Sequence, residues 1–220
     1  MARDSTVTAM AQLTCIAHSR DDLTDIIEGY RDVGLENLLA LDGDPPAGVE
    51  DYPQELVYAS ELVELINDID DGFSIGVAAQ PELHPRSTDR ATDRAFLADK
   101  LSASDFAITQ FFFEPEPYLT MVDELAELGC TKPILPGIMP VTNIGQVKRF
   151  AELSGAEFPP ALAERLAVVA DDPAAVRAVG VELATELCAA LLEAGVPGLH
   201  FYTLNRSTAT REIAANLGLA

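Results

Sequence analysis

The sequence predicts an α/β protein of the (β/α)8, or TIM-type, barrel class, with about six of the eight strand–helix units present. Short apolar runs alternate with amphipathic stretches along the whole chain, and this implies parallel pairing because a parallel neighbour needs a crossover. The runs alternate little between apolar and polar residues, as expected of strands covered on both faces. Polar residues follow the strands and no Gly-x-Gly-x-x-Gly motif does, which favours a barrel over an open doubly wound sheet.

The N-terminal half carries the signals for three strand–helix units. Ser19 is a candidate N-cap before an acidic first turn, and Gly34 ends the apolar pattern of that helix. A loop with Pro45, Pro46 and Gly48 follows the second strand. The expected elements are a strand over 13–17, a helix that starts after Ser19, a strand over 37–41, a helix over 59–69, a strand over 73–79 and a helix over 90–102.

The C-terminal half continues the pattern without a linker, repeat or low-complexity segment, so we expect a single domain over residues 1–220. Two extra helices are predicted before the last strand, because two amphipathic segments follow one another there. The expected elements are a strand over 106–112, a helix over 118–128, a strand over 133–139, helices over 144–153, 160–169 and 172–194, a strand over 198–203 and a helix over 207–217.

The chain is strongly acidic, with 36 Asp and Glu residues against 14 Lys and Arg residues and a net charge of -22. Such a field repels phosphates, so we expect no nucleic-acid partner. The acidic residues are spread along the chain, which is typical of a surface suited to a salt-rich cytoplasm. GC-rich coding is an alternative origin of such a composition, because it also replaces Lys with Arg. No apolar stretch of about 18 residues and no secretory signal is present, so we expect a cytoplasmic protein without membrane contact. We also expect a homo-oligomer.

The three cysteines, Cys15, Cys130 and Cys188, are isolated and odd in number. Reduced, buried thiols are the simplest interpretation. His84 has no second His or Cys at ligand spacing, so we expect no metal. We interpret His18 and His200 as structural.

Polar residues stand at or just after the carboxyl ends of several predicted strands, namely Asp44, His84, Gln110, Asn143 and Arg206. In a barrel these ends meet at one mouth, where the chemistry lies. We therefore expect Asp44, Gln110 and Arg206 to surround a single cavity.

Each of these residues also has a purely structural interpretation. A buried Gln110 needs matched hydrogen bonds, and it is either a satisfied core amide or an amide that pairs with a ring such as a pterin. His84 either holds its loop together or contacts a cofactor. Asn143 is also a helix cap. Arg206 pairs either with a substrate carboxylate, which its planar fork suits, or with surface acid.

Seven segments read together resemble 5,10-methylenetetrahydrofolate reductases, in order and spacing, from about Ser5 to Leu219: LTCIAHS, LALDGDPP, YASELV, VAAQPELHP, AITQFFF, PGIMPVTN and FYTLNRS. The resemblance implies a TIM barrel that uses FAD, and an oxidoreductase of one-carbon metabolism and methionine biosynthesis. In that family NAD(P)H reduces the flavin, which passes hydride to methylenetetrahydrofolate.

The resemblance also implies roles for individual residues. Asp44 and Gln110 match catalytic positions, where the aspartate stabilises the cationic iminium form of the folate and the glutamine touches nicotinamide and pterin. Folate would be held by Asp44, Gln110, Gln146 and Arg206. The positions that match flavin contacts are Gly43, Asp44, Tyr58, Ala59, His84, Asp93, Lys100 and Tyr202.

The chain departs from the family pattern at several of these places. Asp42 stands where the family has an arginine that holds the flavin nucleotide, and Asp99 where another basic contact is expected. A family histidine is replaced by Gln12 and a tyrosine by Gln80. The changes to Asp42 and Asp99 should weaken anion binding, unless Lys100, Arg94 or helix N-termini compensate.

The family begins with a strand that carries a glutamate acting as general acid, and this chain begins after that strand. About two units are therefore expected to be absent, through a misplaced start, a fragment or a partner that fills the gap. Two rivals stay open beside a flavin-dependent reductase. One is a flavin-independent reductase of the same barrel type, and the other is a non-catalytic folate-binding paralogue.

Overall fold

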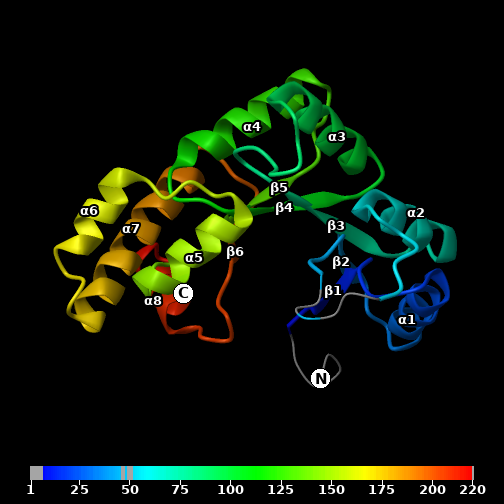
Figure 1. Ribbon diagram of the computed structural model, residues 1–220, viewed down its shortest axis with the longest axis horizontal. Coiled ribbons are helices and arrows are strands. Elements are labelled where there is room, and N and C mark those ends of the chain that lie inside the picture. Colours follow the sequence, from blue (N-terminus) through cyan, green and yellow to red (C-terminus); the bar gives the residue numbers. More distant parts are fainter. Residues whose placement is uncertain (1–6, 46–47, 49–51, 220) are drawn as a thin grey trace. The chain divides into compact units, whose positions relative to one another are not determined.

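The computed structural model describes residues 7–45, 48 and 52–219, in which strands and helices alternate as the sequence predicts (Figure 1). Within these residues six strands follow one another in the sheet in chain order, and the pairs β1–β2, β2–β3 and β5–β6 are parallel. The strands are β1 (Met10–Thr14), β2 (Asn37–Leu41), β3 (Ser74–Ala79), β4 (Phe106–Phe111), β5 (Ile134–Ile138) and β6 (His200–Phe201). This confirms the predicted class, six consecutive units where a closed TIM-type barrel has eight.

Local signals in the sequence set most helix ends. Ser19 caps α1 in a capping box, because its Oγ accepts the N–H of Asp22 (3.1 Å) while the Asp22 carboxylate accepts the N–H of Ser19 (2.9 Å). Helix α4 begins earlier than predicted, since Pro115 suits the first helical position. The helices are α1 (Arg20–Asp32), α2 (Ala59–Ile69), α3 (Arg90–Ser102), α4 (Pro115–Glu127), α5 (Ile144–Ser154), α6 (Pro160–Ala167), α7 (Pro173–Glu193) and α8 (Thr208–Asn216).

Two strands differ from their predicted bounds by more than one residue at an end. Strand β1 covers Met10–Thr14 rather than 13–17, because it pairs with the five residues of β2 and because Ala17 has a φ of 63°, which ends the extended backbone. Strand β6 is confined to His200–Phe201 rather than 198–203, since a turn with two left-handed residues follows it closely. The predicted positions Ser5 and Pro46 lie outside the described residues.

The cysteines are free, and Cys15 and Cys188 are buried as predicted. The prediction of a third buried thiol is wrong, because Cys130 is only half-buried. Cys130 lies in the turn after α4, where its N–H bonds back to the carbonyl of Leu125 (2.9 Å), and turns of this kind run along the surface. In the described part of the chain, none of the helices is long and apolar enough to cross a bilayer.

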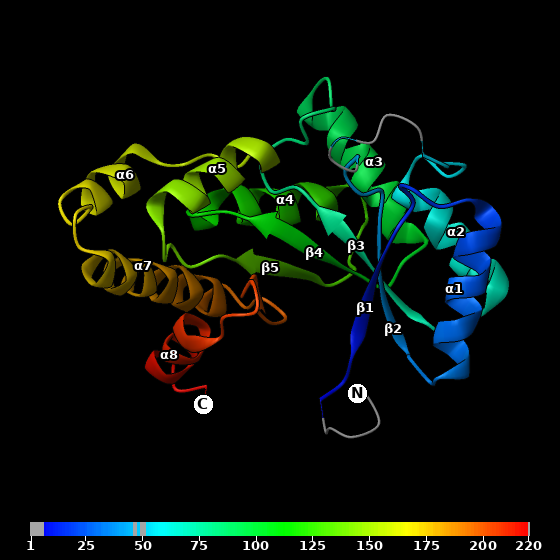
Figure 2. The same cartoon turned by 60° about the horizontal axis from the view of Figure 1, so that its bottom comes forward.

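The chain folds into two compact units, which are described separately. Unit 1 comprises Met1–Ala78 and Phe96–Ala107, and unit 2 comprises Ala79–Ala95 and Ile108–Ala220. In unit 1, α1 and α2 lie side by side (Figures 1 and 2). The unit 1 core is aliphatic, with fully buried Leu23, Ile27, Leu38, Leu62, Ile66 and Ile75. The prediction of a single domain stays a prediction.

In unit 2 the long helix α7 packs against α6 and α8 (Figure 2). The core cluster of this region joins the ends of β4 and β5 to α5, α6 and α7, through Phe111, Met139, Val141, Val147, Ala151, Leu162, Leu166 and Val176. This packing fixes α5, which carries the candidate folate residue Gln146, next to the carboxyl end of β5.

Helix α7 contains a glycine, Gly180, at a point where helix propensity alone favours alanine by about 1 kcal/mol. A Cβ at Gly180 would come within 1.9 Å of the Val141 carbonyl oxygen. We therefore expect Gly180→Ala to lower the melting temperature of the protein, against the propensity trend. The matched control is Gly29→Ala in α1, where a Cβ meets nothing within 4 Å. Equal or higher stability of Gly180→Ala in thermal unfolding would contradict the close packing.

Candidate functional site

In unit 1, the segment Asp42-Gly43-Asp44 follows the carboxyl end of β2. Gly43 has a φ of 83°, and a Cβ there would lie 2.5 Å from Ile16 Cγ2, so only glycine fits. The Asp42 carbonyl accepts the N–H of Ile16 (3.0 Å), which fixes the segment to the end of β1. As a result Asp42 is half-buried and Asp44 is exposed at the strand end, where the sequence places it.

The other predicted cofactor residues of unit 1 lie on α2 and α3. Tyr58 is the exposed N-cap residue of α2, and Ala59 is the buried first residue of that helix. The Lys100 ammonium donates to the carbonyl of Ala78 (2.7 Å) near the carboxyl end of β3, and Asp99 is exposed beside it.

The buried thiol Cys15 lies against the Tyr58 carbonyl, 3.5 Å away. Burial, with added negative charge from Asp42, raises the pKa of Cys15 to about 11. The thiol is therefore protonated and unreactive at neutral pH.

In unit 2, Gln110 is half-buried at the fifth position of β4. Its Oε1 accepts the N–H of Phe111 (3.0 Å). No partner of its amide nitrogen is found among the described residues. The oxygen is therefore satisfied within the chain, whereas the two N–H donors stay free for a ligand.

Gln146 is exposed in the first turn of α5. Asn143 is the N-cap of that helix, and its Oδ1 accepts the N–H of Gln146 (2.9 Å). The capping interpretation of Asn143 is thus confirmed, while the Gln146 side chain stays at the surface.

Arg206 follows β6 in a tight turn, in which its N–H donates to the carbonyl of Thr203 (2.8 Å). The two central residues, Leu204 and Asn205, have φ angles of 48° and 61°. Asn accepts this conformation readily, whereas Leu does so at a cost. The surrounding structure thus holds Arg206 on a strained turn, a feature found at ligand sites.

Tyr202 stands at the end of β6, where its hydroxyl donates to the carbonyl of Thr109 (2.8 Å). Burial raises the pKa of Tyr202 to about 12. Its ring packs edge-on against Phe111, and a Cβ at Gly137 would lie 2.7 Å from that ring. The hydroxyl is therefore bonded within unit 2, and a predicted cofactor contact of Tyr202 would use the ring.

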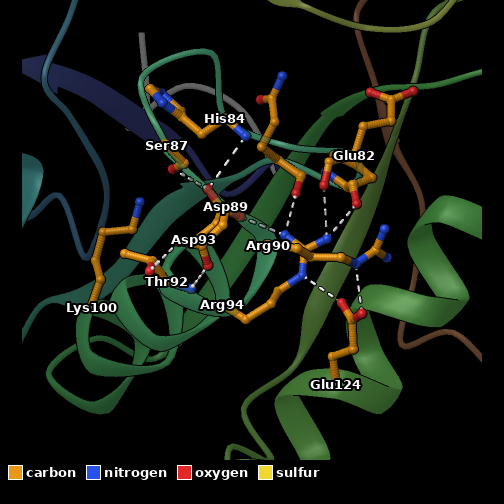
Figure 3. A network of polar contacts seen from close by, with 12 residues as sticks. Glu82, His84, Ser87, Asp89, Arg90, Thr92, Asp93, Arg94, Lys100 and Glu124 are labelled. Atoms are coloured by element: carbon orange, nitrogen blue, oxygen red, sulfur yellow. Dashed lines mark hydrogen bonds and ion pairs between the residues drawn. The ribbon is translucent and has the colours of Figure 1, made fainter.

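His84 and Asp93 belong to a polar network around the segment 80–87, here called the 80–87 loop (Figure 3). Asp93 is 7% exposed, and its Oδ1 accepts from Ser87 Oγ (2.6 Å) and from the N–H of His84 (3.3 Å). Its Oδ2 accepts from Arg94 Nη1 (2.6 Å). Both oxygens of the Asp93 carboxylate thus accept hydrogen bonds from their own chain. This gives Asp93 a structural role, in addition to the flavin contact that the resemblance predicts.

From the sequence, Arg94 was named only as a cation that could compensate for lost anion contacts, and Glu124 and Glu82 were missed. Arg94 is 2% exposed and bonds to Asp93, to Glu124 (2.8 Å) and to carbonyls of the 80–87 loop. Glu82 has one buried oxygen without a hydrogen bond among the described atoms, and burial raises its pKa. The spacing of Arg90 and Arg94 on one helix face was the signal that could have pointed to the network.

The flavin dinucleotide implied by the resemblance carries a diphosphate, which needs cations or free N–H donors. In unit 1 the segment at the end of β2 presents two carboxylates, Asp42 and Asp44, and Lys100 already donates to a carbonyl. In unit 2 the Arg94 guanidinium is buried among acceptors of its own chain. The donors at these predicted flavin positions therefore do not fit the diphosphate of FAD.

A cavity of about 310 Å³ opens in unit 2 among α4, α6 and α7. Its walls are mostly apolar and include Phe113, Met139, Leu162, Leu183 and Leu187. Gln110, Gln146 and Arg206 do not line it. The expected cavity shared by Asp44, Gln110 and Arg206 stays a prediction.

Comparisons with known proteins point to one family. A family model described as methylenetetrahydrofolate reductase matches residues 1–218. The chain is 38% identical over 212 residues to the 5,10-methylenetetrahydrofolate reductase of Escherichia coli K12, covering 96% of this chain and 70% of that one. It is 37% identical over 216 residues to a probable methylenetetrahydrofolate reductase (NADPH) of Caenorhabditis elegans, covering 97% of this chain.

The chain spans a third (33%) of the length of the Caenorhabditis elegans relative. A probable methylenetetrahydrofolate reductase (NADH) of Oryza sativa is 35% identical over 227 residues, covering 97% of this chain and 38% of that one. Among solved structures, a Clostridium thermocellum protein described as binding two copies of 5-methyl-5,6,7,8-tetrahydrofolic acid superposes with a TM-score of 0.66. That match has 14% identity and covers 96% of this chain and 72% of the other, so it shows the shared fold.

Proposed function

Because the chain belongs to the methylenetetrahydrofolate reductase family, we propose that it reduces 5,10-methylenetetrahydrofolate to 5-methyltetrahydrofolate with a reduced pyridine nucleotide. The bond between N10 and the methylene carbon breaks and N10 takes up a proton, which leaves a cationic iminium at N5. A hydride with its two electrons then forms the new C–H bond of the methyl group. The pyridine nucleotide leaves oxidised, so the step consumes one nucleotide and one proton.

The observation that carries the proposal is the free amide of Gln110. A half-buried strand residue whose oxygen is satisfied and whose two N–H donors are not is suited to pair with the acceptor edge of a heterocycle such as a pterin. The curated relatives are named for this reduction with NADPH or NADH. The Clostridium thermocellum protein that shares the fold is described as binding the product, a methylated tetrahydrofolate.

We assign the remaining roles by charge. Asp44 is an exposed carboxylate at a strand end, and it would stabilise the cationic iminium. Gln146 and Arg206, both exposed in unit 2, would hold the folate. The folate tail is anionic, which suits the guanidinium of Arg206.

The cations of unit 2 support an anionic ligand. Arg149 on α5 and Arg206 after β6 make no ion pair among the described residues, although the chain carries a large excess of acid. Lys148 lies 5.3 Å from the Phe158 ring centre rather than on a carboxylate. Helix α5 and the Arg206 turn follow the carboxyl ends of the neighbouring parallel strands β5 and β6, so both elements begin at the same end of the sheet.

FAD is the cofactor that the resemblance implies, and the carboxylates Asp42 and Asp99 make weak FAD binding the expected result. Direct hydride transfer from the nicotinamide without bound flavin is the second candidate, which the same two residues favour. When FAD is bound it supplies a two-electron carrier between nucleotide and folate. The residues named above act on the folate in either case, by pairing with the pterin, holding the tail and stabilising positive charge.

The test is an anaerobic assay of the purified chain with methylenetetrahydrofolate and NADH or NADPH, with and without added FAD. Formation of 5-methyltetrahydrofolate, detected by mass spectrometry, is the expected result. Turnover that needs no FAD identifies the flavin-free route. Folded protein that binds folate but forms no product under either condition identifies a non-catalytic folate-binding paralogue and rejects the reductase.

Arg206 provides a direct test of the folate assignment. Losing one charged hydrogen bond costs about 1.5 to 3 kcal/mol, so we expect Arg206→Met to raise the Kd for 5-methyltetrahydrofolate roughly tenfold to a hundredfold. Isothermal titration measures the change. Arg211→Met on α8 is the control, since Arg211 is also exposed and its side chain has no partner among the described residues. Equal losses in both variants would indicate a general charge effect.

A further inference from the structure

One arginine, Arg94, holds the backbone of the 80–87 loop. Arg94 donates to three consecutive carbonyls of the loop, those of Gln80 (3.1 Å), Pro81 (2.6 Å) and Glu82 (3.0 Å) (Figure 3). Its side chain is 3% exposed. A planar fork is required for such a set of contacts, because an ammonium group is a point donor.

The charge of Arg94 is balanced inside the network. Arg94 pairs with Asp93 (2.6 Å) and with Glu124 of α4 (2.8 Å), and Arg90 pairs with the other oxygen of Glu124 (2.6 Å). Two cations therefore meet two carboxylates. Partial burial acts to raise the pKa of Glu124, but hydrogen bonds from Arg94 and Arg90 outweigh it and lower that pKa. Glu124 is thus ionised at neutral pH, and each arginine is paired with a carboxylate.

The same loop is tied to helix α5 on its other side. The Gln80 side-chain nitrogen donates to the carbonyl of Ser154, the last residue of α5 (2.5 Å). The Glu82 carboxylate accepts the N–H of Glu157 (3.2 Å), just beyond that helix. At the C-cap, Gly155 has a φ of 75°, and a Cβ there would lie 2.9 Å from Pro85 Cγ. The C-terminal end of α5 therefore rests on the loop.

We propose that Arg94 is a positioning residue for substrate, acting through the 80–87 loop to hold helix α5 and its Gln146 in the geometry that binds a reduced folate. Arg94 fixes the backbone of the loop, and Gln80 carries that position to the end of α5. The inference rests on the proposed function, because the folate is the ligand assigned to α5. Arg94 itself does not touch the substrate.

The test compares variants that break successive links. Arg94→Lys keeps the charge but loses the fork, and Gln80→Leu keeps the Arg94 contacts but loses the bond to Ser154. Small displacements of a binding group cost large factors, so each variant should raise the Kd for 5-methyltetrahydrofolate roughly tenfold. Arg90→Gln is the control, because Arg90 also bonds Glu124, while its side chain makes no recorded bond to the loop carbonyls. Titration is done without nucleotide.

Hydrogen exchange of the α5 amides supplies a second readout that needs no ligand. Faster exchange over 144–154 in Arg94→Lys and Gln80→Leu, with unchanged exchange in Arg90→Gln, is expected. Folate affinity within twofold of the wild type and unchanged α5 exchange in both variants would overturn the inference. If the wild-type protein binds no folate, the proposed function fails, and α5 exchange alone decides whether the tether exists. A misfolded Arg94→Lys leaves Gln80→Leu to decide.

Discussion

Asp42→Arg is expected to tighten FAD binding at least about tenfold, by replacing an anion with a cation at the position that the family resemblance assigns to a flavin contact. The change is two charge units. The Asp42 backbone is held by its carbonyl bond to Ile16 (3.0 Å) and by the glycine conformation of Gly43, neither of which depends on the side chain. The substitution leaves both of these backbone features in place and changes the local charge by two units.

The affinity is measured by flavin fluorescence quenching, at the lowest KCl concentration that keeps the protein folded, because salt screens the effect. Asp42→Asn, which removes one charge unit, should give an intermediate Kd. Asp71→Arg is the matched control, since Asp71 is exposed in unit 1 ahead of β3, at the opposite end of that strand from the candidate residues. An equal gain in Asp71→Arg would show that the net charge acts rather than a site at Asp42.

A wild-type protein that binds FAD tightly would contradict the poor fit inferred from Asp42, Arg94 and Lys100. Titrating FAD into variants that each lack one candidate donor would then locate the compensating donors. Only the loss of such a donor would raise the Kd for FAD. Cys15 gives an independent sign of the local field, since the negative charge of Asp42 contributes to its raised pKa. In Asp42→Arg the thiol should titrate at a lower pH, which thiolate absorbance can follow.

Much of the fold was predictable because its signals are local. The spans of α2 and α3 were predicted to the residue, and Ser19 was identified as a cap, since periodicity and capping act within a few positions. Strand β6 was predicted too long, because pairing with β5 decides its length and only Gly137 and Ile138 take part.

The candidate site was less predictable, because its partners are distant in sequence. Arg94 looked like a free cation, yet Glu124 lies 30 residues away and its other acceptors are backbone carbonyls that no side-chain pattern reveals. Gly180 is explained only by the approach of Val141. Gln110 was partly predictable. The sequence identified the residue, but only the structure shows that its side-chain oxygen is bonded while its N–H donors are free.

The second large effect concerns salt. The chain has 36 acidic and 14 basic residues, so even if every base were paired, 36 - 14 = 22 carboxylates would have no cation. Self-repulsion of this kind destabilises the compact state. We expect the melting temperature to rise by about 10 °C between 0.05 M and 2 M KCl, since screening lengths fall from above 10 Å to a few Å. Thermal unfolding followed by circular dichroism measures the slope.

Salt also strengthens apolar burial, so a higher melting temperature in KCl can have two causes. Screening of charge repulsion must be separated from stronger burial. A triple variant, Asp25→Lys, Glu64→Lys and Glu127→Lys, changes three exposed acids on α1, α2 and α4 and takes the net charge from -22 to -16. If repulsion dominates, this variant should melt higher than the wild type at low salt and respond less to KCl. If burial dominates, both proteins should show the same slope, because the substitutions leave the core unchanged. The difference between the two slopes therefore measures how much of the stability at low salt is lost to the chain's own charge.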